Sequence, residues 1–130
     1  MNHPTTPGEL TVLGATVHHP IAYVESFPAP QGCTRVRLHS EEVASMCPVT
    51  NQPDLSRVVI EYEPRGLCVE SKSLKLYLWS FRDRAIFAEA LSAEIASEIM
   101  RAASPQLVTV TVTQGVRGGI IVETESTLGG

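Results

Sequence analysis

Several features that mark common classes of protein are missing from this chain of 130 residues. No apolar run approaches the roughly 20 residues that a helix needs to span a bilayer. The N-terminus lacks the basic stretch and apolar stretch of a secretory signal. Ten Lys and Arg stand against fourteen Asp and Glu, whereas proteins that bind the phosphate backbone are usually basic. The sequence therefore predicts neither a membrane partner nor a direct nucleic-acid partner.

The cysteine and histidine patterns exclude other common classes. Cys33, Cys47 and Cys68 are odd in number and widely spaced, with no CxxC. A disulfide framework is therefore not expected, and a reducing, cytoplasmic compartment is predicted. None of the four histidines has zinc-like spacing to a cysteine and HExxH is absent, so no metal site is predicted. Neither GxGxxG nor GxxxxGKS occurs, so Rossmann and Walker-type nucleotide sites are unsupported.

The composition is that of a globular protein, with 43% hydrophobic and 18% charged residues. The length corresponds to one ordinary domain, so we expect a single domain over residues 1–130. Its first ten residues are polar and carry Pro4 and Pro7, which predicts a flexible arm at 1–10.

Hydrophobic periodicity predicts the secondary structure. Alternating apolar and polar residues predict strands at 34–40, 57–63, 107–113 and 120–125. A strand or an extended segment is expected at 10–17, a loop at 27–32 and a frayed end at 127–130. Ser71 is the expected N-cap before a helix at 73–82. A second helix is predicted at 85–103, with an apolar face of Phe87, Leu91, Ile95 and Ile99.

The predicted order is two strands, two helices and two strands. This order is typical of an α+β fold in which an antiparallel sheet carries two helices on one face. Such a sheet has two free edges, and proteins normally pair or cover exposed edges. We therefore expect an oligomer in which sheets join edge to edge.

One predicted loop holds a cysteine close to a carboxylate. Cys47 and Asp54 both lie in SMCPVTNQPD, between two predicted strands. A free thiol, with a pKa near ~8.5, is only slightly ionised at neutral pH, so a cysteine nucleophile needs a local basic group or dipole. Asp54 is a candidate proton donor or acceptor beside it. On spacing alone, a small buried hydrophobic residue is the more usual role of such a cysteine.

The segment ESKSLK combines Glu70 and Ser71 with Lys72 and Lys75, which share one helical face. Backbone N–H groups at a helix start favour anions, so a phosphate-bearing ligand would fit here. Arg117, followed by two glycines, would likewise place a cation near a phosphate. Taken alone, each pattern is more typical of a solvated helix start or a hairpin turn. Glu89 is either a carboxylate for a purine-like ring edge or an exposed helical residue.

Together these segments resemble the QueF family, the NADPH-dependent 7-cyano-7-deazaguanine reductases of queuosine biosynthesis. ESKSLKLY is the most specific of the matching motifs. The segments that carry the resemblance are ESFP at 25–28, CPVTNQPD at 47–54, ESKSLKLYLWSFRD at 70–83, FAE at 87–89 and RGGI at 117–120. The resemblance implies the tunnelling fold, in which sheets of several subunits form a barrel. It further implies a homo-oligomer, a decamer of two pentamers, with active sites at subunit interfaces.

The resemblance also implies a mechanism. Cys47 matches the nucleophile that forms a covalent thioimidate with the nitrile, and Asp54 matches the residue that protonates the nitrile nitrogen. Glu70, Glu89 and Ser71 match substrate-binding positions. A second set of positions is associated with NADPH: Ser71, Lys72, Lys75 and Arg117.

The chain departs from the family pattern at Ala88, where a histidine usually stands. The loss of a side chain that titrates near neutrality is compatible with a reductase in which another group takes over the role. Two alternatives stay open. One is an enzyme that uses the thioimidate for amidine formation or other altered nitrile chemistry, and the other is a non-catalytic protein that binds a deazapurine or pterin.

Overall fold

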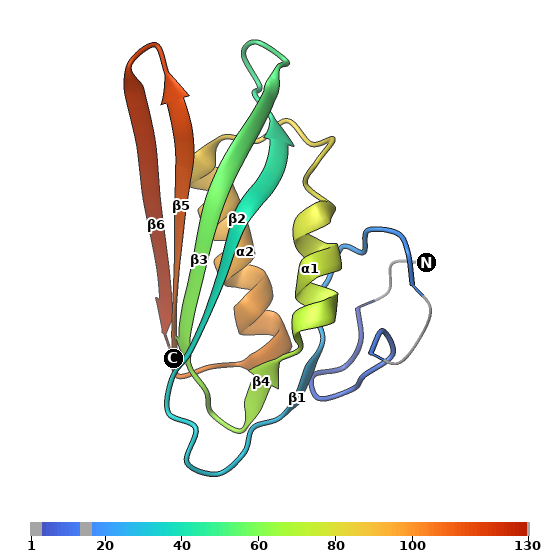
Figure 1. The fold of residues 1–130 in the computed structure, drawn as a ribbon. Helices are drawn as coiled ribbons and strands as arrows, with labels where there is room; N and C mark the ends of the chain where they lie inside the picture. The colour runs from blue at the N-terminus through green and yellow to red at the C-terminus, as the bar shows by residue number, and fades with distance from the viewer. Residues whose placement is uncertain (1–3, 14–16, 130) are drawn as a thin grey trace.

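A computed structural model describes residues 4–13 and 17–129, without the side chains of Val116 and Arg117. It has the predicted α+β architecture, with antiparallel sheets and two helices (Figure 1). Its elements in chain order are β1 (Ser26–Pro28), β2 (Val36–Met46), β3 (Pro53–Glu63), β4 (Leu67–Val69), α1 (Ser71–Trp79), α2 (Ala88–Ala103), β5 (Leu107–Arg117) and β6 (Ile120–Gly129). Neither helix of the described residues is long and apolar enough to cross a membrane.

The main sheet has four antiparallel strands in the order β2-β3-β5-β6. Both helices lie on the same side of it, with α2 across β5 and β6 and α1 toward the β2 edge (Figure 1). The alternation predicted for β3 and β5 is confirmed, because their inward residues are buried and their outward residues are not. The inward residues are Val58, Ile60, Tyr62, Val108, Val110 and Val112.

The apolar face predicted for α2 is confirmed in three of its four residues. Leu91, Ile95 and Ile99 are fully buried against the sheet, whereas Phe87 is 52% exposed at the N-cap position. The helix begins at Ala88 and not at the predicted 85, because the preceding segment bonds to the end of β2. Met46 donates its N–H to the Arg84 carbonyl, and Ile86 donates to the Met46 carbonyl.

Strand β2 runs to Met46, six residues beyond its predicted end. The pairing register of β2 with β3 shifts between Ser40 and Val43, which is a β-bulge. Beyond the bulge, Val43 and Ser45 face the core. The alternation changes phase at the bulge, and this is why the sequence pattern ended the strand too early.

Three other predictions at element ends are wrong. Residues 26–28 form β1 and pair with β4, so the loop predicted at 27–32 is wrong at 27–28 and confirmed at 29–32. β6 extends to Gly129, which pairs with Leu107, so the described part of 127–130 is not frayed. The N-cap of α1 is Glu70 and not Ser71, because the Glu70 carboxylate accepts the free N–H groups of the first turn.

The N-terminal segment packs against the rest of the chain in its described parts. Gly8 donates its N–H to Ser26 Oγ at 2.7 Å, and the Thr5 carbonyl accepts from Arg101 at 3.1 Å. Val12 is buried with Ile21. The strand predicted at 10–17 does not form at its described residues, and 14–16 lie outside them.

Candidate active site

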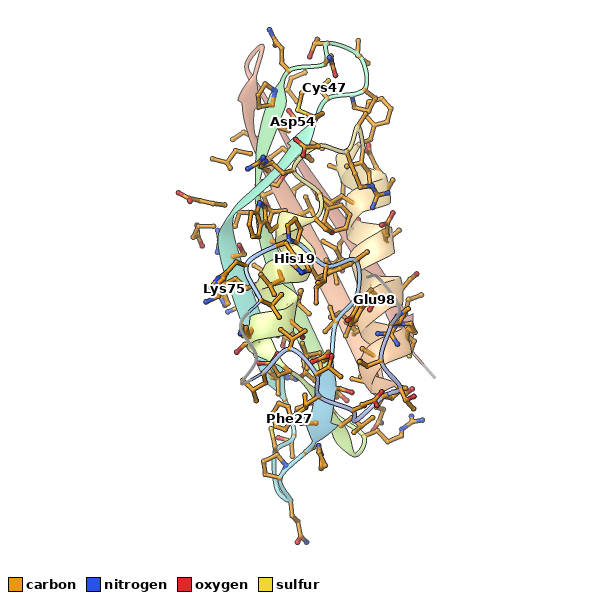
Figure 2. The ribbon with its side chains drawn as sticks, turned by 90° about the vertical axis from the view of Figure 1, so that its right-hand side faces the viewer. His19, Phe27, Cys47, Asp54, Lys75 and Glu98 are labelled. Carbon is orange, nitrogen blue, oxygen red and sulfur yellow. The ribbon has the colours of Figure 1, made fainter. Side chains whose placement is uncertain are left out.

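The turn between β2 and β3 presents Cys47 at one end of the sheet, which we name the Cys47 end (Figure 2). Two backbone bonds close the turn: Cys47 donates its N–H to the Gln52 carbonyl, and Asn51 donates to the Cys47 carbonyl, both at 2.9 Å. Asn51 has a φ of 57°, a left-handed conformation that asparagine tolerates better than most residues. The turn therefore holds its side chains in a defined arrangement around the thiol.

Hydrogen bonds within this turn activate the thiol of Cys47. The Thr50 hydroxyl has the largest effect in lowering the pKa of Cys47, followed by the backbone N–H groups of Thr50 and Val49. Desolvation and the negative charge of Asp54 act in the opposite direction and are smaller. The dipole that a cysteine nucleophile needs is thus supplied by a hydroxyl and two amides rather than by a basic side chain.

Asp54 is the second residue of β3 and is 6% exposed. It lies opposite Ser45 of β2, so its side chain faces the helix-covered side of the sheet. Its negative charge acts to raise the pKa of the Cys47 thiol, which indicates that the two groups lie close together. The structure therefore brings together the pair that the sequence singled out.

Glu70 has a structural role as the N-cap of α1. Its carboxylate is 4% exposed and accepts the N–H of Lys72 at 2.8 Å and that of Ser73 at 2.7 Å. Glu25, in the segment ESFP, is also buried and accepts the N–H groups of Thr11 and Val12. Because Glu70 already fills the amides of the first turn, the expectation that these amides are free for an anion is wrong.

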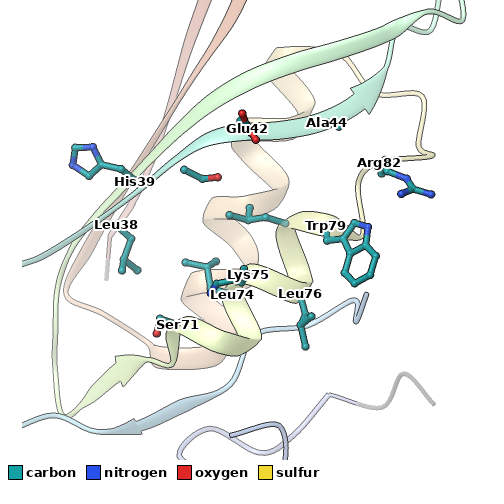
Figure 3. A pocket seen from close by; sticks show the side chains of 12 residues that line it. Leu38, His39, Glu42, Ala44, Ser71, Leu74, Lys75, Leu76, Trp79 and Arg82 are labelled. Carbon is teal, nitrogen blue, oxygen red and sulfur yellow. The ribbon is translucent and has the colours of Figure 1, made fainter. Parts of the chain in front are cut away.

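The other residues of the ESKSLK segment line or flank a groove of about 680 Å³ between α1 and β2 (Figure 3). Ser71 and Lys75 are exposed on its wall, while Lys72 Nζ donates to the Val12 carbonyl at 3.2 Å. The floor of the groove is formed by Leu38, Ala44, Leu74 and Leu78. Cations and apolar surface therefore meet along the free edge of β2.

The segment from Glu70 to Lys72 lies far from Cys47 within one chain. Val69 donates its N–H to the Tyr62 hydroxyl at 2.8 Å, which ties the start of α1 to the far end of β3. Tyr62 follows Asp54 by eight residues on β3, and at about 3.3 Å per residue this corresponds to roughly 26 Å. Figure 2 shows Lys75 on the side of the molecule, well below Cys47 and Asp54.

Glu89 and Arg117 lie toward the Cys47 end. Glu89 is exposed in the first turn of α2, which follows directly on the segment bonded to Met46. Ala88 beside it is 2% exposed. Arg117 ends β5 at the hairpin to β6, and its side chain lies outside the described part of the chain.

The sequence patterns did not single out Thr50 or a group of buried polar residues at the Cys47 end, Ser45, Ser56 and Gln114. Thr50 lies within the singled-out loop, but its bond to the thiol depends on the turn closing. Ser56 was in reach of the pattern, since it continues the inward alternation of β3 toward Asp54. Within the described residues, no cluster of three His, Cys, Asp or Glu side chains is arranged to hold a metal ion.

The sequence matches a family model and several named proteins. Residues 53–128 match the family model described as QueF-like protein. A protein of Syntrophus aciditrophicus named NADPH-dependent 7-cyano-7-deazaguanine reductase is 40% identical, over 94% of this chain and 91% of its own. One of the same name from Frankia casuarinae is 39% identical, over 91% and 94%.

A crystal structure of the archaeosine synthase QueF-Like in the apo form superposes with a TM-score of 0.71. It is 31% identical and covers 78% of this chain and 97% of its own. The family model spans the chain from β3 into β6, and each of the two reductases aligns over more than nine-tenths of this chain. The chain therefore belongs to the QueF-like protein family.

Proposed function

We propose that this protein is an NADPH-dependent oxidoreductase that converts the nitrile of 7-cyano-7-deazaguanine into the aminomethyl group of 7-aminomethyl-7-deazaguanine, a step of queuosine tRNA-modification biosynthesis. Several full-length relatives carry the reductase name. The observation that carries the proposal is the thiol of Cys47, whose pKa is lowered by Thr50 and by backbone amides beside a buried carboxylate. A domain that only binds a deazapurine or pterin has no use for such a nucleophile.

Cys47 and Asp54 perform the first step. The sulfur of Cys47 adds to the nitrile carbon, one C–N π bond breaks, and a covalent thioimidate forms. The thiol proton reaches the nitrile nitrogen through the carboxylate of Asp54, so no proton is gained or lost. When bound, NADPH supplies the two electron pairs that turn the thioimidate carbon into the aminomethyl carbon. The C–S bond breaks after the first reduction, and Cys47 is returned as a thiol.

The groove beside α1 fits a phosphate-bearing cofactor. Lys75 and Ser71 offer a cation and a hydroxyl on its wall, and Lys72 lies one turn away on the same helix. Leu74 and Leu78 provide apolar surface for a flat ring. Because Glu70 occupies the first-turn amides, the side chains of α1 rather than its backbone would hold the phosphates. Arg117 is our further candidate for a phosphate contact.

A complete site then needs a second copy of the chain. The roughly 26 Å of strand between Asp54 and the start of α1 separates the nucleophile from Glu70, Ser71 and Lys72. The free edge of β2 borders the groove, where a strand of a neighbouring copy would continue the sheet. We propose that the copies form a barrel, a decamer of two pentamers, in which the α1 side chains of one subunit face Cys47 of the next. Glu70 and Glu89 are then candidates for the deazapurine edge at this interface.

Mixed subunits test the shared site. Variants Cys47→Ala and Lys75→Ala, each impaired alone, are expected to regain activity when unfolded together and reassembled, because some interfaces then combine two unmodified sides. Reassembly of each variant with itself is the control. Mixed oligomers with no more activity than the two separate variants would refute a site shared between subunits.

Amidine formation is the second candidate, favoured by the likeness to the archaeosine synthase structure. It would use the same Cys47 thioimidate but accept ammonia in place of two electron pairs. Ala88, which is small and buried, carries no titratable group that would favour either outcome. The exposed Lys75 and Ser71 in the groove favour the reductase, since an ammonia-dependent enzyme needs no phosphate site.

The test is NADPH consumption with 7-cyano-7-deazaguanine, with product identification by mass. Two NADPH consumed per nitrile and an aminomethyl product are expected. Cys47→Ser should abolish both, while Cys33→Ser, the same change at a half-buried cysteine outside the site, should leave them unchanged. Full turnover by Cys47→Ser would refute the nucleophile, and an amidine formed with ammonia and without NADPH would favour the second candidate.

A further inference from the structure

The inward face of the sheet changes from apolar to polar at the Cys47 end. Along β3 it passes from Tyr62, Ile60 and Val58 to Ser56 and Asp54. Ser56 is 1% exposed, Ser45 is 0% exposed and Gln114 is 9% exposed. Four adjacent polar side chains therefore lie at buried positions that apolar residues ordinarily fill.

The strand register places these side chains next to one another. Ser45 of β2 lies opposite Asp54, and Ser56 lies opposite Gln114 of β5. Opposite residues of antiparallel strands share a face with Cβ atoms about 5 Å apart, and residues two apart on a strand share that face as well. The three neutral side chains thus form a polar patch around the carboxylate.

The patch holds hydrogen-bonding atoms that the described residues do not satisfy. Ser45 Oγ, Ser56 Oγ and Gln114 Nε2 are all buried, and none bonds to a protein group of the described chain. Buried polar atoms in proteins are nearly always paired, with ordered water where no protein group is available. All three can donate, and the charged acceptor of the patch is Asp54.

We propose that Ser45, Ser56 and Gln114 are positioning residues that hold the Asp54 carboxylate through ordered water, so that it passes the Cys47 proton to the nitrile nitrogen. The inference rests on the proposed function and adds residues to its site. Donated hydrogen bonds fix the orientation of the carboxylate toward the thiol.

Other charged groups near this end have partners of their own or are exposed. In the segment between α1 and α2, Arg84 bonds to Glu94 of α2 and stacks on the Phe81 ring, while Asp83 is exposed. Glu89 at the start of α2 is exposed as well. On the side of the turn, the titratable neighbour is Cys47. The neutral side chains of the patch are the ones that the strand register places beside Asp54 on the inward face.

The test compares two reactions of Cys47 as a function of pH, without NADPH. Adduct formation with the nitrile, followed by intact mass, needs the proton transfer through Asp54 as well as the thiol. Alkylation by iodoacetamide needs only the thiolate. Without a donor, the carboxylate of Asp54 is no longer held toward the thiol, so the adduct rate falls at every pH while the alkylation rate does not.

For Ser56→Ala and Gln114→Leu we expect the adduct rate on the plateau to fall by roughly tenfold, the size expected for one lost hydrogen bond to a charged group. The alkylation profile should stay near wild type. Ser92→Ala is the matched control, since Ser92 is 1% exposed but its hydroxyl bonds to the Glu89 carbonyl and to Ser126. Its two profiles should match those of the unmodified protein.

If Ser56→Ala folds poorly, Ser56→Thr and Ser56→Val replace it, because they add equal bulk and only threonine keeps the hydroxyl. An adduct rate that falls in the valine variant alone supports the inference. Adduct rates that stay at the unmodified value in all variants, or alkylation rates that fall equally, would overturn it and leave these residues a structural role. An unmodified protein that forms no adduct would overturn the proposed function, and this inference with it.

Discussion

Glu70 offers the most direct choice between a structural and a substrate-binding role. Its buried carboxylate accepts two backbone N–H groups at 2.7 and 2.8 Å and so caps α1. An N-cap contributes about 0.5–2 kcal/mol to stability, and two short bonds to a buried charge put Glu70 near the upper value. Glu70→Ala should therefore reduce the free energy of unfolding by about 2 kcal/mol.

Urea unfolding at fixed protein concentration measures this loss, because unfolding of an oligomer depends on concentration. With a slope of about 2 kcal/mol per M, the midpoint should fall by about 1 M. Glu70→Asp is the matched variant: aspartate is a preferred N-cap residue, so most of the stability should be kept. Its shorter side chain withdraws the carboxylate from any ligand across an interface.

The two variants separate the roles. If capping is the main role, Glu70→Ala is unstable and Glu70→Asp is stable with near-normal nitrile reduction. If Glu70 also holds the deazapurine edge, Glu70→Asp is stable but its KM for the nitrile rises. A Glu70→Ala protein as stable as the unmodified chain would refute the capping argument, whatever its activity.

Three further outcomes follow from the structure. Thr50 lowers the pKa of Cys47 and burial raises that of Cys68, so iodoacetamide should label Cys47 well before Cys68 in peptide mass maps. Thr50→Val should move the labelling of Cys47 to higher pH. Equal labelling rates at both cysteines would contradict this. Leu91→Ala, in the fully buried face of α2, should cost about 2–5 kcal/mol in denaturant unfolding, and a loss below 1 kcal/mol would mean that the face is not packed as described. Ser104→Gly should raise the melting temperature slightly, since Ser104 has a φ of 44° at the C-cap that glycine adopts without strain; a lower melting temperature would contradict it.

The parts of the fold that the sequence predicted are those whose periodicity is unbroken. The alternating Val and Thr of β5 and the four-residue repeat of α2 each reflect one face against one core. The second half of β2 was missed because the bulge after Ser40 reverses which residues face inward. β1 and β4 were missed because three-residue strands carry too short a pattern and depend on pairing with each other.

The candidate site was likewise predicted only in part from the sequence. Cys47 and Asp54 could be predicted together from one segment, since only six residues connect β2 to β3 and keep the two side chains close. The bond from Thr50 was not, because it depends on the left-handed Asn51 that closes the turn. The cap by Glu70 was missed because glutamate is not among the preferred N-cap residues, and its burial depends on β4 and on Glu25.

The buried polar side chains at the Cys47 end stabilise the fold less than apolar side chains would, and the apolar remainder of the inward face compensates for this. Each buried polar atom without a protein partner costs about 1–3 kcal/mol unless water satisfies it, and the patch contains three. Below the patch, the inward apolar residues of β3 and β5 and the apolar face of α2 form a continuous core. Apolar residues at Ser56 and Gln114 would extend that core by one layer and stabilise the fold, but they would remove the neutral donors that we propose to hold Asp54. That proposal therefore explains the polar residues at these two positions better than the packing of the sheet does.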